Sequence, residues 1–186
     1  MNPVALLARH CDPSSRAFEI LVTHSVLVTA KARAIAASYL ERVPDAAVDL
    51  DFLTEAAMLH DVGIVRCDAP VIGCEGDEDY LRHGVLGREI LDREGLPRHA
   101  LVCERHTGAG IASEDVRRRA LPLPERDYLP ISLEERIICV ADKFFSKTPS
   151  KLWREKPLDE IGRRLAKHGP QVAERWDALR RDILGD

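Results

Sequence analysis

The chain has 186 residues, of which 45% are hydrophobic, 31% are charged and 5% are aromatic. These proportions are normal for a soluble globular protein and favour helix, so we expect a single all-α domain over residues 1–186. The net charge of −4 and the interspersed basic residues exclude an extended basic surface for nucleic acid.

The cysteines and the lack of a long apolar segment indicate the cellular compartment of the protein. Five cysteines without regular spacing exclude a disulfide framework. Cys103 and Cys139 fall beside apolar residues and are interpreted as small core residues. No window approaches the ~20 apolar residues of a membrane span. We therefore expect a cytoplasmic protein without a membrane or nucleic-acid partner.

The first predicted helix runs from Ser14 to about Arg42. Its apolar stripe consists of Phe18, Leu21, Val28, Ala32 and Ile35. His24 lies three residues after Leu21 and four before Val28, so it occupies a largely interior position. Such a histidine is either a hydrogen-bonded core residue or a ligand.

A second helix carries the segment LTEAAMLHDVG from Leu53 to Gly63. Leu53, Ala56, Ala57 and His60 share one face at 3.6 residues per turn. Asp61 follows about 100° round the helix, and Gly63 is predicted to end it with a left-handed cap. Imidazole and carboxylate together suit a borderline metal ion, although a buried His can also be a plain core residue.

Residues 64–79 follow with a proline, two glycines and five acidic residues, and predict a loop that could form a lid or a specificity element. Asp68, Asp77 and Asp79 could bind a metal there. An acidic loop is more often simply solvated, so we leave these three residues out of the site.

The next predicted helix runs from about Glu78 to Glu94 and carries a further candidate, His83. Gly84 and Gly87 each weaken this helix by up to ~1 kcal/mol relative to Ala. Close approach of another helix or of a ligand would explain them, and we favour helix packing.

After a turn at Gly95 and Pro97, a short helix is predicted from His99 to His106. Its two histidines lie about 10 Å apart along the axis and cannot readily share one metal. We favour His106, which stands at the helix end beside a Gly-rich turn, as His60 does. His99 lies in a first turn, which is often exposed.

A Pro-rich loop over residues 119–132 precedes a helix predicted from Leu133 to about Lys147. Its apolar face, formed by Ile138, Ala141 and Phe145, also carries Asp142. A buried unpaired carboxylate costs several kcal/mol, so Asp142 needs a cation or a salt bridge to Arg. Helices over residues 157–184 complete the chain, and Trp153 and Trp176 are interpreted as packing residues.

The pattern H…HD…D, formed by His24, His60, Asp61 and Asp142, resembles the HD superfamily of metal-dependent phosphohydrolases, and HDVG looks like its HDIG variant. Five motifs occur in order over about residues 16–148: HS at 24, HDVG at 60, RHGVLGREIL at 82, ERHTGAGI at 104 and VADKF at 140. The motifs from 82 and 104 look like small uncharacterised HDIG-domain proteins. More distantly, they are similar to the symmetrical diadenosine tetraphosphate hydrolases of the same superfamily.

The resemblance implies a helical bundle, an HD domain with a core over 16–148, and a central metal site. The implied metal ligands are His24, His60, Asp61 and Asp142, with His83 and His106 available for a second metal or for a phosphate. Asp61, His83 and His106 are the implied catalytic residues. Lys143 and Arg105, which neighbour site residues in sequence, are candidate phosphate contacts.

The expected cofactor is one or two divalent ions of Mn, Fe, Co, Ni or Zn, because His and carboxylate ligands suit these metals. The expected reaction is hydrolysis of a phosphate ester or anhydride of a nucleotide or related small molecule by metal-activated water. A non-hydrolytic nucleotide-binding HD module and a di-iron oxygenase are the alternatives. The sequence does not specify an oligomeric state.

Overall fold

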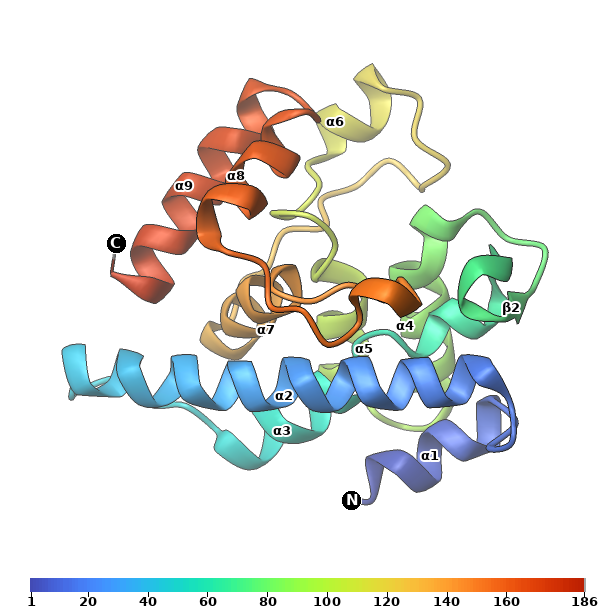
Figure 1. The fold of residues 1–186 in the computed structure, drawn as a ribbon. Coiled ribbons are helices and arrows are strands. Elements are labelled where there is room, and N and C mark those ends of the chain that lie inside the picture. Colours follow the sequence, from blue (N-terminus) through green and yellow to red (C-terminus); the bar gives the residue numbers. More distant parts are fainter. Residues whose placement is uncertain (186) are drawn as a thin grey trace.

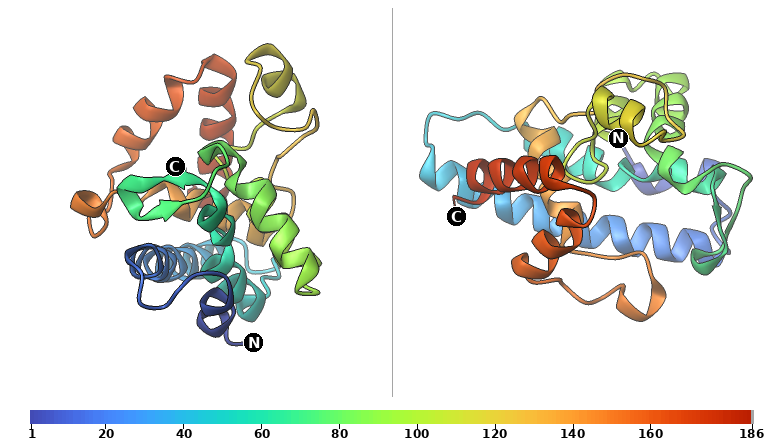
Figure 2. Two further views of the ribbon diagram at one scale, coloured as in Figure 1. Left: turned by 90° about the vertical axis from the view of Figure 1, so that its right-hand side faces the viewer. Right: turned by 90° about the horizontal axis from the view of Figure 1, so that it is seen from above.

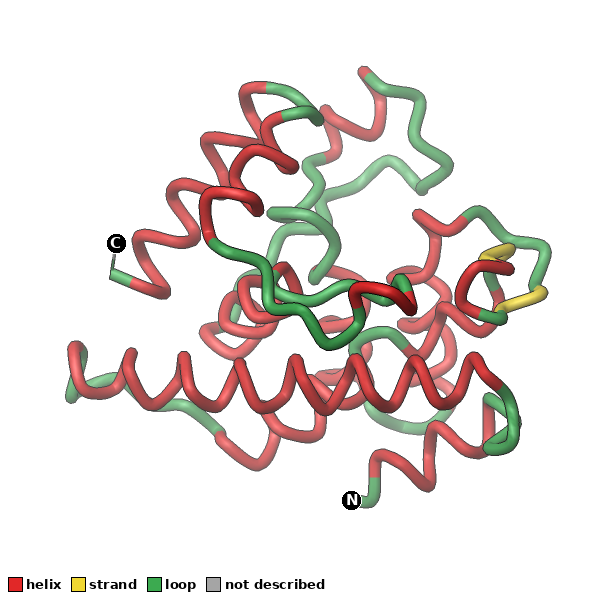
Figure 3. The backbone as a smooth tube through the Cα atoms, viewed as in Figure 1, coloured by secondary structure: helices red, strands yellow, loops and turns green. Residues whose placement is uncertain are grey.

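A computed structural model describes residues 1–185, and over this range the chain is helical (Figures 1 and 3). The predicted all-α fold is confirmed. The nine helices are α1 (Pro3–His10), α2 (Arg16–Arg42), α3 (Leu50–Leu59), α4 (His83–Arg93), α5 (Pro97–Arg105), α6 (Ser113–Arg118), α7 (Leu133–Lys143), α8 (Leu158–Ala166) and α9 (Pro170–Leu184). Of these, α1 and α6 were not predicted from the sequence.

Helix α2 is the longest element, and α3 and α7 pack against it (Figure 1). Ser15 caps its start, because the Ser15 hydroxyl accepts a hydrogen bond from the Phe18 amide at 3.1 Å. Helices α8 and α9 pack together at one end of the molecule, and α1 lies at the opposite end (Figures 1 and 2). The middle of α2 is therefore enclosed by other helices.

Two hydrophobic clusters meet at the middle of α2. One contains Val28 with apolar residues of α7 and α9. The other contains Leu21 with apolar residues of α1 and the end of α4. His24 stands between Leu21 and Val28, at the boundary of the clusters. Its polar ring is thus surrounded by protein, which fits the interior position predicted from the stripe.

The length and composition of α2 would allow it to cross a membrane, which corrects the expectation that no segment has this property. A core helix of a soluble protein passes the same test. Helix α2 packs against α3 and α7 and contributes eleven buried residues. Its apolar composition is thus explained by the core that it forms.

The segment predicted as a loop over 64–79 has more structure than expected. Two 3₁₀ turns, Val62–Arg66 and Pro70–Ile72, alternate with two-residue strands, β1 (Asp68–Ala69) and β2 (Cys74–Glu75). The strands pair antiparallel, with Asp68 opposite Glu75 (Figure 3). Gly73, at φ +82°, allows the tight connection between them. This segment is a compact hairpin rather than an irregular loop.

The end of α3 differs from the prediction in one important detail. The helix ends at Leu59, so His60 and Asp61 follow it rather than lie within it. Gly63 does not adopt the predicted left-handed cap and lies in the 3₁₀ turn Val62–Arg66. That turn packs against α4, so Gly63 serves close packing instead.

The glycines of α4 fulfil the packing role predicted for them. A Cβ atom at Gly84 would lie 2.8 Å from the Cys103 carbonyl oxygen, and one at Gly87 would lie 3.2 Å from the Cys103 sulfur. Helices α4 and α5 therefore approach closely. The helix itself begins at His83 rather than near Glu78, after a 3₁₀ turn over Tyr80–Arg82.

The C-terminal end of α7 and the two tryptophans bring two further corrections. Helix α7 ends at Lys143, so Lys147 lies in the non-helical segment that follows. Trp153 is 74% exposed and is not a packing residue. Trp176 on α9 is 1% exposed and packs in the hydrophobic core, as predicted.

Candidate metal centre

The four side chains of the H…HD…D pattern converge on one point. The His24 Nε2 atom lies 3.0 Å from Asp142 Oδ1 and 3.2 Å from Asp61 Oδ2. The His60 Nε2 atom lies 3.0 Å from the same Asp61 oxygen and 3.4 Å from Asp142 Oδ1. All four ligand atoms fall within 4.8 Å of one another and could hold a metal ion.

Three separate elements position these side chains. His24 projects from the middle of α2, Asp142 from the last turn of α7, and His60 and Asp61 from the two residues that follow α3. All four residues are buried, with exposed fractions between 0% and 8%. The packing of α3 and α7 onto α2 therefore forms the cluster.

Asp61 also belongs to a second group of buried side chains. Its Oδ1 atom lies 3.4 Å from His106 Nε2 and 3.6 Å from His83 Nε2, and these two nitrogen atoms are 3.1 Å apart. His83 begins α4 and His106 follows the last residue of α5. The two oxygens of Asp61 thus face two different groups, the arrangement of a bridging carboxylate.

Three of the histidines are oriented by the same local contact. The Nδ1 atoms of His60, His83 and His106 each donate to the carbonyl oxygen three residues earlier, at 2.7, 2.6 and 2.7 Å. Since a carbonyl only accepts, Nδ1 carries the proton in each ring. The Nε2 atom of each ring consequently points into the cluster, the orientation of a metal-ligating histidine.

The donor set fits a divalent ion. The His60 Nε2 and Asp61 Oδ1 atoms are buried without a hydrogen-bond partner, a costly arrangement unless another group binds there. Ligand atoms that share an ion at about 2.1 Å lie roughly 3 Å apart at right angles. The four histidine–carboxylate separations of 3.0–3.4 Å in this group match that spacing, and all four ligand atoms lie within 4.8 Å of one another.

The two carboxylates are ionised although they are buried. Burial by itself would raise their pKa values. The charges of His60 and Lys147 nevertheless hold the pKa of Asp61 well below its usual value. Lys143 and Lys147 do the same for Asp142. Both carboxylates are therefore in the ionised form that can bind a cation, and Lys143 and Lys147 carry balancing positive charge beside them.

The histidines respond differently to the same surroundings. Burial, together with the neighbouring His106, lowers the pKa of His83 to about 3, and burial also lowers the pKa of His106. Both rings are thus neutral, which is the form that binds a metal. Burial opposes the charged form of His60 too, but Asp61 and Asp142 raise its pKa to about 9. That negative field also favours a divalent cation.

The sequence analysis did not select Lys147, which the structure brings into the cluster. Its ammonium group donates to Asp61 Oδ2 at 2.5 Å and lies 3.4 Å from His24 Nε2. Lys143 donates to Asp142 Oδ2 at 2.6 Å and to the His106 carbonyl oxygen at 3.1 Å. The non-helical chain after α7 folds back to place Lys147, and helical periodicity does not predict such a return.

Two other candidates lie away from the cluster. His99 packs edge-on against Phe52 and lies 3.4 Å from Glu55; it is 9% exposed, not in an exposed first turn as predicted. Of the two histidines of this segment, the structure brings His106 to the cluster and leaves His99 outside it. The Arg105 guanidinium pairs with Glu135 at 3.1 Å and is not brought to the cluster.

The helical fold and the buried His and Asp cluster define an all-α protein with a candidate metal centre. The HD domain profile matches residues 21–146, and the chain belongs to the HD domain family. This family is part of a superfamily of metal-dependent phosphohydrolases. The sequence resemblance is therefore correct at the level of the family.

Several curated proteins are similar to the chain. An uncharacterised protein of Methanocaldococcus jannaschii is 35% identical over 126 residues, 67% of this chain and 66% of that protein. A tRNA (cytidine(56)-2'-O)-methyltransferase of Thermoplasma volcanium is 34% identical over 127 residues, 64% of this chain and 34% of that enzyme. The Picrophilus torridus protein of the same name is 34% identical over 99 residues, covering 53% and 25%. The chain thus spans 25–66% of these relatives' lengths, and no solved structure matches it.

The second group of ligands leads to a prediction about metal stoichiometry. The double variant His83→Ala with His106→Ala is expected to halve the bound metal, since neutral rings that share Asp61 are suited to a second ion. Elemental analysis of the purified protein measures this ratio. His99→Ala, a buried histidine outside the cluster, is the matched control and should keep the full metal content.

Two results would decide against a second ion. If the metal content stays and substrate affinity falls by the ~1.5–3 kcal/mol of a charged hydrogen bond, the pair contacts phosphate instead. If metal content and catalytic efficiency both stay, the two histidines are core residues.

Proposed function

We propose that the chain is a phosphohydrolase that cleaves a phosphate ester or anhydride of a nucleotide or related small molecule. The observation that carries this proposal is Asp61, whose two oxygens face two separate groups of histidine ligands. A pair of divalent ions held there would suit phosphoryl chemistry, in which both the attacking and the leaving oxygen need stabilisation.

In the proposed site, His24, His60, Asp61 and Asp142 would hold one ion, and His83, His106 and Asp61 would hold a second. Bound divalent metal supplies a low-pKa water and neutralises phosphoryl oxygens. The mixed ligands favour Mn, Fe, Co, Ni or Zn over Mg or Ca. Asp61 orients both sites, and its burial keeps bulk water away from the ligands.

Lys143 and Lys147 supply positive charge at the open side of the cluster, where they line a cavity together with Asp142. Lys143 remains our candidate phosphate contact, because its ammonium group is fixed beside Asp142. Arg105 is removed from this role, since its guanidinium is engaged by Glu135.

A screen of phosphate compounds tests the proposal. The metal-loaded protein is incubated with nucleotides, dinucleoside polyphosphates and sugar phosphates under each of the candidate divalent ions, and released phosphate or nucleotide is measured. We expect metal-dependent hydrolysis of one substrate group. No turnover with any compound would favour a non-hydrolytic nucleotide-binding module, and oxygen uptake by an iron-loaded protein would favour the di-iron oxygenase.

A further inference from the structure

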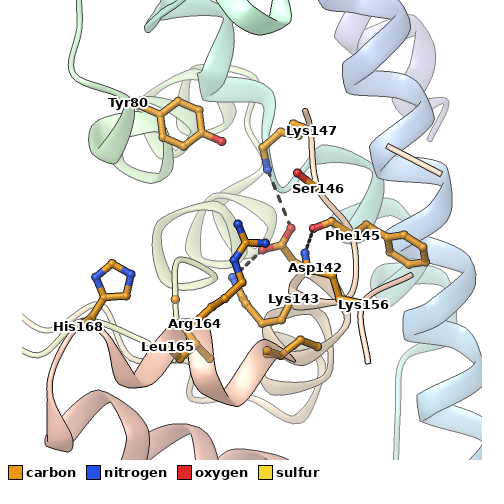
Figure 4. Close-up of a pocket in the computed structure, with 12 residues that line it drawn as sticks. Tyr80, Asp142, Lys143, Phe145, Ser146, Lys147, Lys156, Arg164, Leu165 and His168 are labelled. Carbon is orange, nitrogen blue, oxygen red and sulfur yellow. Dashed lines mark hydrogen bonds and ion pairs between the residues drawn. The ribbon is translucent and has the colours of Figure 1, made fainter. Parts of the chain in front are cut away.

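A cavity of about 400 Å³ opens beside Asp142, and its charged lining is unbalanced (Figure 4). Four cationic side chains face one carboxylate: they are Lys143, Lys147, Lys156 and Arg164, opposite Asp142. Asp142 is already paired with Lys143 at 2.6 Å, and Lys147 is paired with Asp61. The positive charges of Lys156 and Arg164 remain without an equivalent partner in the cavity.

Lys156 is a buried cation with an unusual environment. Only 8% of the residue is exposed, and no carboxylate lies within ion-pair distance of its ammonium group in residues 1–185. Its ammonium group donates to the Phe145 carbonyl oxygen, and its backbone amide donates to Phe144 O at 2.8 Å. Both contacts fix Lys156 at the wall of the cavity. A buried charge without a counterion is costly, so an anionic ligand would relieve it.

Arg164 lies on α8 and lines the same cavity as Asp142 (Figure 4). Its nearest acidic partner is Glu160 at 3.7 Å, whose carboxylate also accepts two hydrogen bonds from Arg154 at 2.9 Å. The guanidinium of Arg164 therefore has only one long ion pair, with Glu160. A planar guanidinium of this kind suits phosphate oxygens.

The protonation of Lys156 is consistent with this environment. Burial lowers its pKa to about 8; Asp142 opposes the shift, while Lys143 and Arg164 add to it. The ammonium form still predominates at pH 7, which is below that pKa. Lys156 is therefore charged at neutral pH and repelled by neighbouring cations until an anion binds.

We infer that Lys156 and Arg164 form a second phosphate subsite beside the metal centre, and that the substrate is a phosphoanhydride with at least two linked phosphates. This inference rests on the proposed phosphohydrolase function. The two residues lie beyond the matched HD domain, which ends at residue 146. The C-terminal part of this chain thus adds substrate selectivity to a centre built by the family domain.

The subsite also explains how the leaving group would be stabilised. In anhydride hydrolysis, the oxygen of water would bond to one phosphorus, and the bridging P–O bond to the other phosphate would break. The electron pair of that bond stays on the departing phosphate, and the two hydrogens of the water pass to the products or to solvent. Lys156 and Arg164 would hold the departing phosphate, where fixed cations stabilise developing negative charge.

Binding of two non-reacting probes tests the subsite without requiring turnover. Calorimetry on the metal-loaded full chain compares methylenediphosphonate, a diphosphate analogue with a carbon bridge, with orthophosphate. We expect wild-type protein to bind the diphosphonate at least about tenfold more tightly. Lys156→Met and Arg164→Gln should each lose about tenfold in that affinity while orthophosphate binding changes less than about twofold. Elemental analysis after titration shows whether the probe has removed metal.

Arg163→Gln is the matched control, because Arg163 lies on the same helix, is exposed and pairs with Asp159. It removes the same charge and should leave both affinities unchanged. Arg164 is also exposed, so its substitution tests the subsite even if Lys156→Met unfolds the chain. Equal losses for both probes, or no loss in either variant, would overturn the subsite.

The binding and hydrolysis experiments together distinguish failure of the subsite proposal from failure of the proposed phosphohydrolase function. Selective diphosphonate binding that depends on Lys156 and Arg164, in a protein that hydrolyses no phosphate compound, would support the subsite and contradict the phosphohydrolase. Hydrolysis of a phosphate monoester without any diphosphonate preference would support the phosphohydrolase and overturn the subsite.

Discussion

Asp61→Asn is expected to lose most of the bound metal and at least about a hundredfold of hydrolytic activity. The physical reason is that Asp61 is the one residue common to both ligand groups. Loss of a group that merely supports a ligand already costs about 10- to 100-fold in metal affinity or activity. A shared ligand should cost more, because the amide keeps the shape of the carboxylate but not its negative charge.

The measurements are elemental analysis for metal and a rate assay with the substrate from the screen. Asp77→Asn is the matched control: Asp77 is an exposed acid of the nearby hairpin segment, and it should leave both quantities unchanged. His60→Ala should also lose metal and activity, with little effect on helix content, since the surrounding helices still pack. Full metal content with full activity in either site variant would show that the cluster is not the reaction centre.

The helical stripes predicted much of this site because its residues occupy positions where a core side chain was expected. The sequence alone shows that His24 lies between Leu21 and Val28 on an apolar stripe and that Asp142 has apolar neighbours. Both are indeed buried at the boundary where helices meet. The convergence of the four residues came from family resemblance, since periodicity cannot specify which helices pack together.

Residues outside regular helices were harder to predict. Lys147 reaches Asp61 only because the chain turns after Lys143, and that turn depends on tertiary contacts. The subsite residue Lys156 is placed by a hydrogen bond from its amide to the Phe144 carbonyl, again after the helix has ended. Trp153 was assigned to packing by residue type alone, yet it lies in this non-helical segment and faces solvent.

The sequence analysis predicted a structural role for Gly63, but the predicted role, a left-handed cap, was wrong. A glycine that follows an apolar helix usually provides a left-handed cap, but Gly63 has no positive φ angle. A glycine is needed at this position because α4 packs too closely for a side chain. The two roles predict different effects of an added methyl group: at a left-handed cap it strains the local backbone, whereas at a packed contact it separates two elements.

Gly63→Ala is therefore expected to destabilise the chain by about 3 kcal/mol or more, the upper end of the cost of overpacking. An added Cβ atom would lie 2.1 Å from the His83 carbonyl oxygen and 2.2 Å from the Gly87 amide nitrogen. Both obstacles are backbone atoms, so no side-chain rotation relieves them. The methyl group must push α4 away from the turn that follows Asp61, and His83 would move with its helix.

Thermal unfolding and metal content together test this mechanism. The control is Gly162→Ala on α8, where the nearest atom to an added Cβ is 3.7 Å away and the helix gains up to about 1 kcal/mol from the better helix former. Gly63→Ala should lower the unfolding temperature and reduce the metal content, because displacement of His83 separates it from Asp61. An unfolding temperature equal to that of wild type would mean that the turn and α4 are not in backbone contact in solution.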